Sequence, residues 1–387
     1  MIFSPAVLFA LSVSYLGMLF LVAHASEKGW LPLRWVRHPI VYSLSLGVFI
    51  SSWGLYGVVQ FAADFGYNFL AFYMGLSGAF LVAPMFLQPL LRLAKTHQLH
   101  SLPDLLAFRF RSQGVGTIAT LAILVGVMPL LTAQMQTMAD LVFLLTGGHS
   151  TRSMGAFFCG VLICFTLLFG TRQRNTRGPS HDGLVIAIAV ESLIKLIAML
   201  AVVAYAYFGI LGGESGLSQW LAANPGALQQ MYRPLQGGYW HSLLLLFFFA
   251  AVVMPCMYQM AFTENREPRD LVAASWGVPL YFMLMAIGIP ILLWAGQALQ
   301  LNLPATYYSL GITLQSDSPW MTLILFVGTL AASSGILIVT TLALAWMLHR
   351  HPHVLPIPGT RRSQHLQQNL AAAQATLPAE VMDALDA

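Results

Sequence analysis

The sequence predicts an all-α polytopic membrane protein, and three observations lead to that fold class. Of the 387 residues, 58% are hydrophobic and only 8% are Asp, Glu, Lys or Arg, whereas soluble domains carry about 25% charged residues. Apolar runs long enough to cross ~30 Å of hydrocarbon recur along the chain. Basic residues gather in the short segments between those runs. This composition argues against a soluble enzyme and a nucleic-acid-binding domain, so we expect no enzymatic activity, no cofactor and no nucleic-acid partner.

The apolar runs predict nine membrane spans. They cover residues 4–24, 39–62, 68–91, 116–145, 153–171, 183–211, 240–262, 274–297 and 319–348. The first run lacks a clear small-residue cleavage site, so we expect a retained helix rather than a signal peptide. Because the chain turns polar after the last run, we predict a transmembrane domain over residues 1–348 and a cytoplasmic tail over residues 349–387.

The basic residues predict the orientation of these spans. Fifteen of the 18 Lys and Arg residues lie in the tail or in the segments after the first, third, fifth and seventh spans. The opposite side has only Arg152 and Arg233, and Lys195 lies within a span. Since basic residues favour the cytoplasmic side, we expect the N-terminus outside and the tail in the cytoplasm. The three cysteines lie in apolar runs, so neither a disulfide framework nor a metal site is expected.

The second predicted span is interrupted near its middle by small and polar residues. The motif over residues 51–57 reads SSWGLYG. Glycines and serines at mid-depth weaken a helix and free backbone groups, which transporters use to bind substrates. The candidate substrate-binding residues here are Ser51, Ser52, Trp53, Gly54 and Tyr56. The same motif also fits a small-residue packing face between helices.

The seventh predicted span contains a second interruption. Met254 and Pro255 lie in its middle, and Tyr258 and Gln259 follow. Proline removes a backbone hydrogen bond and kinks or breaks a helix, so a plain kink is one interpretation. However, this span lies five spans after the first interrupted one. Paired interruptions at this spacing favour an inverted-repeat transporter, in which these four residues would also contact the substrate.

Three ionisable residues of the Asp, Glu, Lys and Arg type fall within spans. Glu191 and Lys195 are spaced i, i+4 with Glu first, the favourable order for an ion pair on one helix. They fit either a structural ion pair or a proton-responsive carboxylate. Asp140 lies near the outer end of its span. In the last span, Ser333 and Ser334 fit either close helix packing or an ion path. These two serines and the three ionisable residues are the candidates for cation coupling.

Five stretches in this order and topology resemble a known family of transporters. They are residues 42–57 (YSLSLGVFISSWGLYG), 101–110 (SLPDLLAFRF), 128–140 (MPLLTAQMQTMAD), 181–198 (HDGLVIAIAVESLIKLIA) and 254–281 (MPCMYQMAFTENREPRDLVAASWGVPLY). The chain resembles the solute:sodium symporter family, and most closely its CbrA-like branch, which is fused to sensor histidine kinases. The resemblance implies a LeuT-type inverted-repeat fold with an extra N-terminal helix and a substrate between the two interruptions.

Two departures from the family change what we expect. The position before the first interruption, acidic in proline-type symporters, is Phe49, and the family's sodium-binding hydroxyls fall near Ala331 and Ala332. Coupling to protons is therefore expected more than coupling to sodium. In addition, family members have more spans than the nine predicted here, so the second repeat is expected to be incomplete and the chain truncated.

The resemblance supports three functional hypotheses. The first is a cation-coupled symporter of a small organic solute, an amino acid in particular. The second is a sensory input domain that binds solute for a histidine-kinase system. The third is a remnant that inserts but does not transport. The expected partners are the lipid bilayer, a small solute with a proton or sodium ion, and a sensor kinase module, and the expected location is the bacterial inner membrane.

Overall fold

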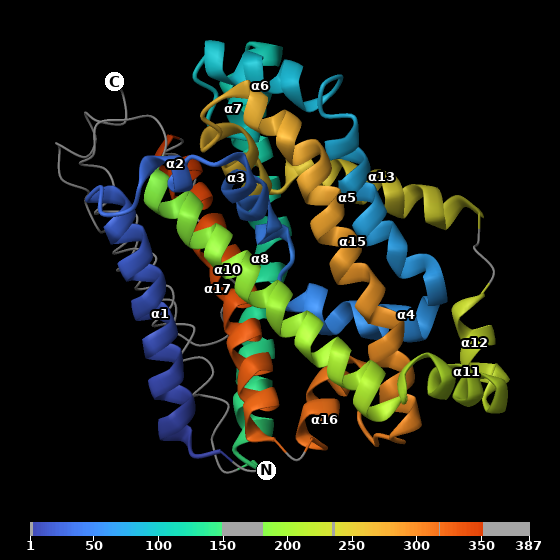
Figure 1. Ribbon diagram of the computed structural model, residues 1–387. Helices are drawn as coiled ribbons and strands as arrows, with labels where there is room; N and C mark the ends of the chain where they lie inside the picture. The colour runs from blue at the N-terminus through green and yellow to red at the C-terminus, as the bar shows by residue number, and fades with distance from the viewer. Residues whose placement is uncertain (1–2, 149–180, 234–236, 317, 351–387) are drawn as a thin grey trace, which may run out of the picture.

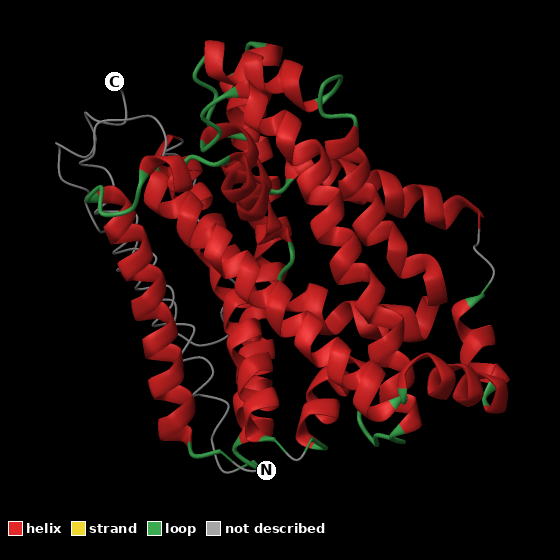
Figure 2. Cartoon of the chain, in the orientation of Figure 1, coloured by secondary structure: helices red, strands yellow, loops and turns green. Residues whose placement is uncertain are grey.

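The computed structural model describes residues 3–148, 181–233, 237–316 and 318–350, and every regular element in this part of the chain is helical (Figure 2). A helix satisfies its backbone groups internally, which is what a segment in lipid requires. Five helical segments are long and apolar enough to cross a membrane. They belong to α1 (Pro5–Glu27), α8 (Gln113–Leu145), α10 (Asp182–Ala204) with its π-helical extension η5 (Tyr205–Ile210), α15 (Pro268–Ala298) and α17 (Pro319–Arg350).

Two further pairs of helical segments are long and apolar enough to cross when each bent pair is taken together. The first joins residues Pro39–Phe49 to Trp53–Leu81 with a bend of 73°, and the second joins Tyr239–Val253 to Pro255–Thr263 with a bend of 53°. If each pair is counted as one span, the described part of the chain has up to seven. Every predicted span has a helical counterpart except residues 153–171, which lie outside the described residues.

The first bent pair covers the predicted span 39–62 and residues 68–81 of the predicted span 68–91. Its elements are α3 (Pro39–Ser45), η1 (Leu46–Phe49), η2 (Trp53–Gly57), α4 (Val58–Phe65), η3 (Gly66–Phe69) and α5 (Leu70–Leu81). Gly66, with φ +58°, separates α4 from α5. A side chain there would be strained and would also overlap the backbone carbonyls of Gln230 and Met231. The chain can therefore turn at this glycine, and α4 and α5 run in different directions (Figure 1).

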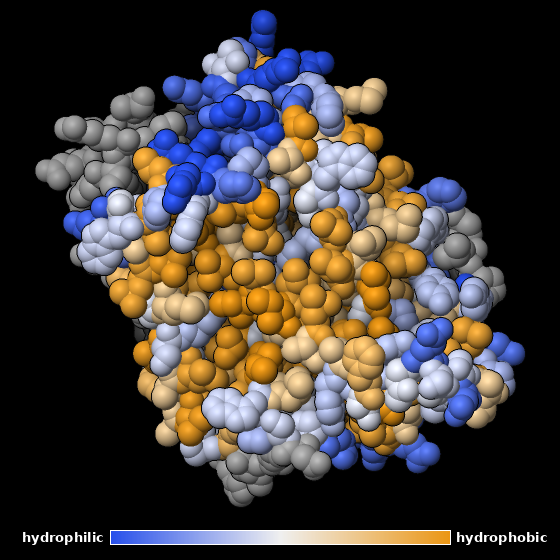
Figure 3. All heavy atoms as spheres, in the orientation of Figure 1, coloured by the Kyte–Doolittle hydropathy of each residue, from blue (hydrophilic) through white to orange (hydrophobic). Residues whose placement is uncertain are grey.

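Short helices cover the two ends of the bundle (Figure 1). At the end that carries the predicted cytoplasmic segments lie α2 (Leu33–Val36), α6 (Leu87–Thr96) and α7 (Leu102–Phe110). The opposite end has α11 (Gly213–Ala223), α12 (Pro225–Met231), η7 (Ala305–Tyr307) and α16 (Tyr308–Leu314). Figure 3 shows a band of hydrophobic residues between a hydrophilic upper end and a mixed lower end. The chain is a multi-pass membrane protein.

Helix α10 occupies the centre of the bundle. It contacts α1, α3, α15 and α17, and both members of the Glu191–Lys195 pair on it are fully buried. On one side, α13 (Gly237–Val253) packs along α5. The break that follows α13 leads into α14 (Pro255–Tyr258) and η6 (Gln259–Thr263), and α14 contacts both η1 and α17.

Polar contacts tie the upper end of the bundle together. The Lys95 ammonium of α6 donates to Asn265 Oδ1 at 3.0 Å and to the Arg266 carbonyl at 2.7 Å. Arg266 also pairs with Asp182 at the start of α10. Burial lowers the pKa of Lys95, because desolvation penalises its charged form. These contacts connect the end of the second bent pair to two other helices.

Candidate functional site

The first helix break lies at residues 50–52, between η1 and η2. Ile50 is extended, with φ −74° and ψ 96°. The Ser52 N–H, which has no helical partner here, donates to Gln134 Oε1 at 3.0 Å, and the Ser52 hydroxyl donates to the same atom at 2.6 Å. The Trp53 N–H donates to Ser51 Oγ at 3.2 Å. Side chains thus replace the carbonyls that a continuous helix would have supplied.

Gln134 belongs to α8 and is fully buried. Its Nε2 donates to the Leu130 carbonyl at 3.3 Å, which leaves Oε1 to accept from Ser52. Gln134 was not among the predicted site residues, although a glutamine in the middle of an apolar span was the available signal. Its role depends on a contact between residues 82 positions apart, which a linear motif does not show.

The aromatic residues of the first break have separate partners. The Tyr56 hydroxyl lies 2.6 Å from Thr329 Oγ1 of α17. The Trp53 ring lies so close to Gly57 that a Cβ at Gly57 would overlap it. The ring also meets Phe72 edge to face at 5.0 Å. Trp53 is 36% exposed, whereas the other candidate residues of this break are buried.

Phe49, just before the break, lies in an aromatic cluster. It stacks on Phe72 with the ring centroids 5.1 Å apart and lies 6.1 Å from the Phe282 ring of α15. A carboxylate at this position would be surrounded by rings that offer it no hydrogen bond. The observed packing therefore suits phenylalanine.

The second break occurs at Met254, which is extended (φ −70°, ψ 124°) and precedes Pro255 at the start of α14. Tyr258 and Gln259 turn toward the upper end of the bundle. The Tyr258 hydroxyl donates to the Leu99 carbonyl at 3.2 Å. Gln259 Nε2 donates to Glu264 Oε1 at 2.8 Å. Tyr258 is therefore bonded to the segment between α6 and α7, and Gln259 to the segment after η6.

The two breaks meet through α14, which contacts η1. Ser51 and Ser52 are buried at the first break, and Pro255 is buried at the second. Tyr258 and Gln259 also line a very small hollow of about 10 Å³ next to α7 and α17. A volume of this size is about that of one water probe. The structure thus places α14 against η1, next to the first break, and directs the polar groups of Tyr258 and Gln259 elsewhere.

The Glu191–Lys195 ion pair lies close to this junction. Lys195 Nζ donates to Glu191 Oε1 at 3.0 Å, and both side chains are fully buried. Glu191 Oε2 has no hydrogen-bond partner among the described residues. Its carboxylate lies against Gly335 of α17, where a Cβ would overlap it. The adjacent Ser192 Oγ lies against Gly47 of η1 in the same way.

Two adjacent serine hydroxyls of α17, those of Ser333 and Ser334, have different surroundings. Ser334 Oγ is 3.1 Å from the hydroxyl of Tyr15 on α1. Ser333 Oγ is buried and has no hydrogen-bond partner in the part of the chain that the structure covers. A buried hydroxyl without a partner costs roughly 1–3 kcal/mol, so it is a candidate for binding an ion, a water or a proton carrier.

Asp140 lies in a different part of the molecule. Its Oδ2 accepts a hydrogen bond from the Tyr307 hydroxyl at 2.9 Å, near the lower end of the bundle. It therefore belongs to the contact between α8 and η7. In the described ranges, no three His, Cys, Asp or Glu residues are grouped so that they could hold a metal ion together.

The fold is that of a LeuT-type symporter. The chain is similar to a solved structure titled as the substrate-bound outward-open state of a Na⁺-coupled sialic acid symporter with a novel Na⁺ site. The two superpose with a TM-score of 0.66 at 12% sequence identity, over 98% of this chain and 80% of that one. At this identity the similarity shows the fold alone.

The C-terminal stretch shows a different similarity. Residues 321–387 match the model of the Aldo/keto reductase family. Pyridoxine 4-dehydrogenase of Escherichia coli K12 is 50% identical over 44 residues, which are 11% of this chain and 15% of that protein. An uncharacterized oxidoreductase of Schizosaccharomyces pombe is 49% identical over 45 residues, 12% of this chain and 15% of that protein. The chain thus spans about 15% of the length of these relatives.

These matches contradict the expectation of no enzymatic activity, because they point to an enzyme-related stretch at residues 321–387. That expectation was wrong because it came from composition averaged over 387 residues, and apolar spans dominate the average. A short polar stretch changes such an average little. The matched stretch begins inside α17 and continues through residues 351–387, which lie outside the described residues.

Proposed function

We propose that the chain is a secondary transporter that moves a small organic solute, an amino acid in particular, and couples this movement to protons in preference to sodium. The LeuT-type fold supports transport, because in such folds broken helices provide backbone groups for the substrate. The observation that carries the proposal is the position of one buried ion pair. Glu191 and Lys195 lie on the helix that contacts both α17 and η1, the segment just before the first break.

The proposed substrate contacts follow from the ends of the broken helices. The N-terminal end of the segment that starts at Trp53 has a partial positive charge and suits the solute carboxylate. Backbone carbonyls at the end of η1 suit its ammonium group. Ser51 adds a hydroxyl, and Met254 and Pro255 form the opposite wall. Amino acids carry both of these charged groups, which is why this solute class is proposed.

The proposed coupling uses the charge of the ion pair. With Glu191 ionised and Lys195 protonated, the pair is neutral and tolerates burial between α10 and α17. When Glu191 Oε2 takes up a proton, the pair gains one positive charge, and burial becomes less favourable. A proton would then favour the state in which α10 has moved relative to Gly47 and Gly335. Proton binding and solute binding are thereby linked through one conformational change.

The test is uptake by proteoliposomes that contain the full chain. Labelled L-amino acids, with L-histidine included, are offered under an imposed pH gradient in sodium-free buffer. We expect uptake that needs the gradient, and a reduction of about tenfold or more in Glu191→Gln. The matched control is Glu214→Gln, an exposed glutamate on α11, which should behave like the original chain. Solute exchange without a gradient should survive in Glu191→Gln.

A dependence of uptake on sodium would contradict the proposed coupling to protons. If uptake is lost when choline replaces sodium at a constant pH gradient, the coupling ion is sodium and the proton proposal is wrong. If no amino acid is taken up or exchanged under any gradient, the transport proposal itself is wrong.

A second candidate function is oxidoreductase chemistry, favoured by the match of residues 321–387 to the Aldo/keto reductase family. It ranks below transport, because the matched relatives are covered over only about 15% of their length. Hydride transfer in such chemistry needs a nicotinamide cofactor. The test is reduction of a nicotinamide cofactor by purified chain with pyridoxine as substrate. We expect any such activity to disappear when residues 351–387 are deleted, and activity that survives the deletion would contradict this candidate.

A further inference from the structure

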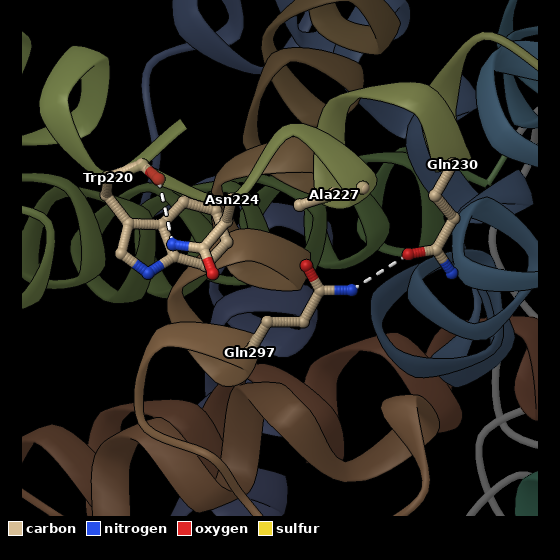
Figure 4. A pocket seen from close by; sticks show the side chains of 6 residues that line it. Trp220, Asn224, Ala227, Gln230 and Gln297 are labelled. Carbon is tan, nitrogen blue, oxygen red and sulfur yellow. Dashed lines mark hydrogen bonds between the residues drawn. The ribbon is translucent and has the colours of Figure 1, made fainter. Parts of the chain in front are cut away.

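A separate hollow of about 260 Å³ lies at the lower end of the bundle, between α11, α12 and the C-terminal end of α15 (Figure 4). It has one aromatic ring, three side-chain amides and no charged side chain in its lining. The lining residues are Trp220, Asn224, Gly226, Ala227, Gln230 and Gln297. A concave site with an aromatic wall and a few polar groups is typical of small-molecule binding. None of these residues belongs to the helix breaks or to the Glu191–Lys195 pair.

The orientation of two of the amides is determined by a backbone carbonyl. Gln230 Nε2 donates to the Ala63 carbonyl at 2.6 Å, and a carbonyl can only accept. Gln230 therefore presents Oε1 to Gln297, whose Nε2 donates to it at 3.0 Å. Gln297 in turn must direct Oε1 away from Gln230, and this oxygen is buried with no hydrogen-bond partner among the described residues. Figure 4 shows the two glutamines and the bond between them.

The third amide is oriented by the same rule. Asn224 Nδ2 donates to the Trp220 carbonyl at 2.9 Å, so Asn224 Oδ1 remains available as an acceptor. Figure 4 shows Asn224 and Gln297 on adjacent sides of the hollow. In both amides the nitrogen already donates one hydrogen bond within the protein, and the oxygen can accept one from a ligand. A ligand with hydrogen-bond donors would satisfy both oxygens.

We propose that this hollow binds the ammonium group of a small organic amine. An ammonium group has three donors and no acceptor, which matches two amide oxygens. An aromatic face such as that of Trp220 also attracts a cation. A carboxylate brings only acceptors and would leave Gln297 Oε1 unsatisfied. The terminal torsion of Gln297 is soft, so a small rotation can bring Oε1 to the ligand.

The hollow is connected to the first broken helix. Ala63, which accepts the bond from Gln230, belongs to α4, the half of that helix beyond the break. Arg233 also donates to the backbone carbonyl of the neighbouring Asp64. Binding in the hollow does not depend on the transport proposal, because it involves different residues.

The experiment is calorimetric titration of the full chain in detergent with three probes of similar size. Glucosamine carries an ammonium group, glucose has a hydroxyl at that position, and glucuronate carries a carboxylate. We expect glucosamine to bind most tightly. Gln297→Met should weaken glucosamine by about tenfold or more, the loss expected for a hydrogen bond to a charged group. Asn224→Ala, a change at an exposed position, tests the second oxygen if Gln297→Met fails to fold.

Two control variants locate the binding. Gln229→Met makes the same change at an exposed glutamine of α12 outside the lining, and it should leave glucosamine affinity unchanged. Trp53→Ala alters the first break and should also leave it unchanged. Equal binding of glucose and glucosamine would overturn the proposal, as would glucosamine binding that Trp53→Ala removes and that Gln297→Met and Asn224→Ala leave intact.

Discussion

The two helix breaks of this protein are maintained in different ways. At the first break, the Ser52 N–H depends on Gln134 of another helix for its hydrogen bond. At the second, backbone bonds flank the break on both sides: Met254 N donates to the Ala250 carbonyl at 3.1 Å, and Tyr258 N donates to the Met254 carbonyl at 2.9 Å. Pro255 lies between them and has no N–H to satisfy. The first break is therefore a tertiary feature, and the second is encoded locally.

This difference suggests a division of roles. A break that depends on a side chain from another helix can change when that helix moves, since its hydrogen bonds are exchangeable. A break at proline does not depend on another helix, because the missing N–H and the ring clash are local. We expect the first break to be the more sensitive to substitution, and the following predictions test this from the largest expected effect to the smallest.

The largest effect is expected at the ion pair that lies between the first break and α17. Lys195→Met leaves the Glu191 carboxylate buried without its partner, which typically costs about 3–5 kcal/mol. We expect a lowered midpoint of thermal unfolding in detergent micelles. The double variant Glu191→Gln with Lys195→Met removes both charges and should recover most of the loss. Lys28→Met at an exposed lysine is the control. A double variant no more stable than Lys195→Met would show that the charges are not the cause.

The next effect is expected at the first break itself. Gln134→Leu removes the acceptor of two hydrogen bonds and leaves the buried Ser52 groups unsatisfied, at about 1–3 kcal/mol. We expect a lower unfolding midpoint together with weaker solute binding. Gln136→Leu makes the same change at an exposed glutamine on the same helix. If both variants unfold at the same temperature, Gln134 does not support the break.

Features that depend on residues close together in the chain were predicted well from the sequence. Membrane spans follow from hydropathy, and the interruptions at residues 51–57 and at Met254–Pro255 are visible as small residues and proline. The spacing of Glu191 and Lys195 predicted their ion pair, because i, i+4 neighbours share a helix face. These features depend on residues close together in the chain.

The remaining features depend on contacts between distant residues. Gln134 and Ser52 meet only when α8 packs against the first break. The direction of Gln259 is set by Glu264, a residue whose position follows from the end of η6. In the hollow between α11, α12 and α15, the orientations of Gln230 and Gln297 depend on the Ala63 carbonyl, which is 167 residues from Gln230. Hydropathy also gave no sign of the similarity of residues 321–387 to the Aldo/keto reductase family. Such a similarity depends on the identity of each residue and not on average polarity.

The smallest effect on stability is expected at the second break. Pro255→Ala restores an N–H and removes the steric clash that prevents a continuous helix. The flanking backbone bonds already exist, so we expect an unfolding midpoint that is unchanged or slightly higher. The 53° bend between the two halves should decrease, which distances between spin labels on α13 and η6 can measure. Solute binding should weaken, because a straight helix moves Met254 away from η1. A loss of stability as large as that of Gln134→Leu would remove the distinction between the two breaks, since both would then depend on contacts that one substitution destroys.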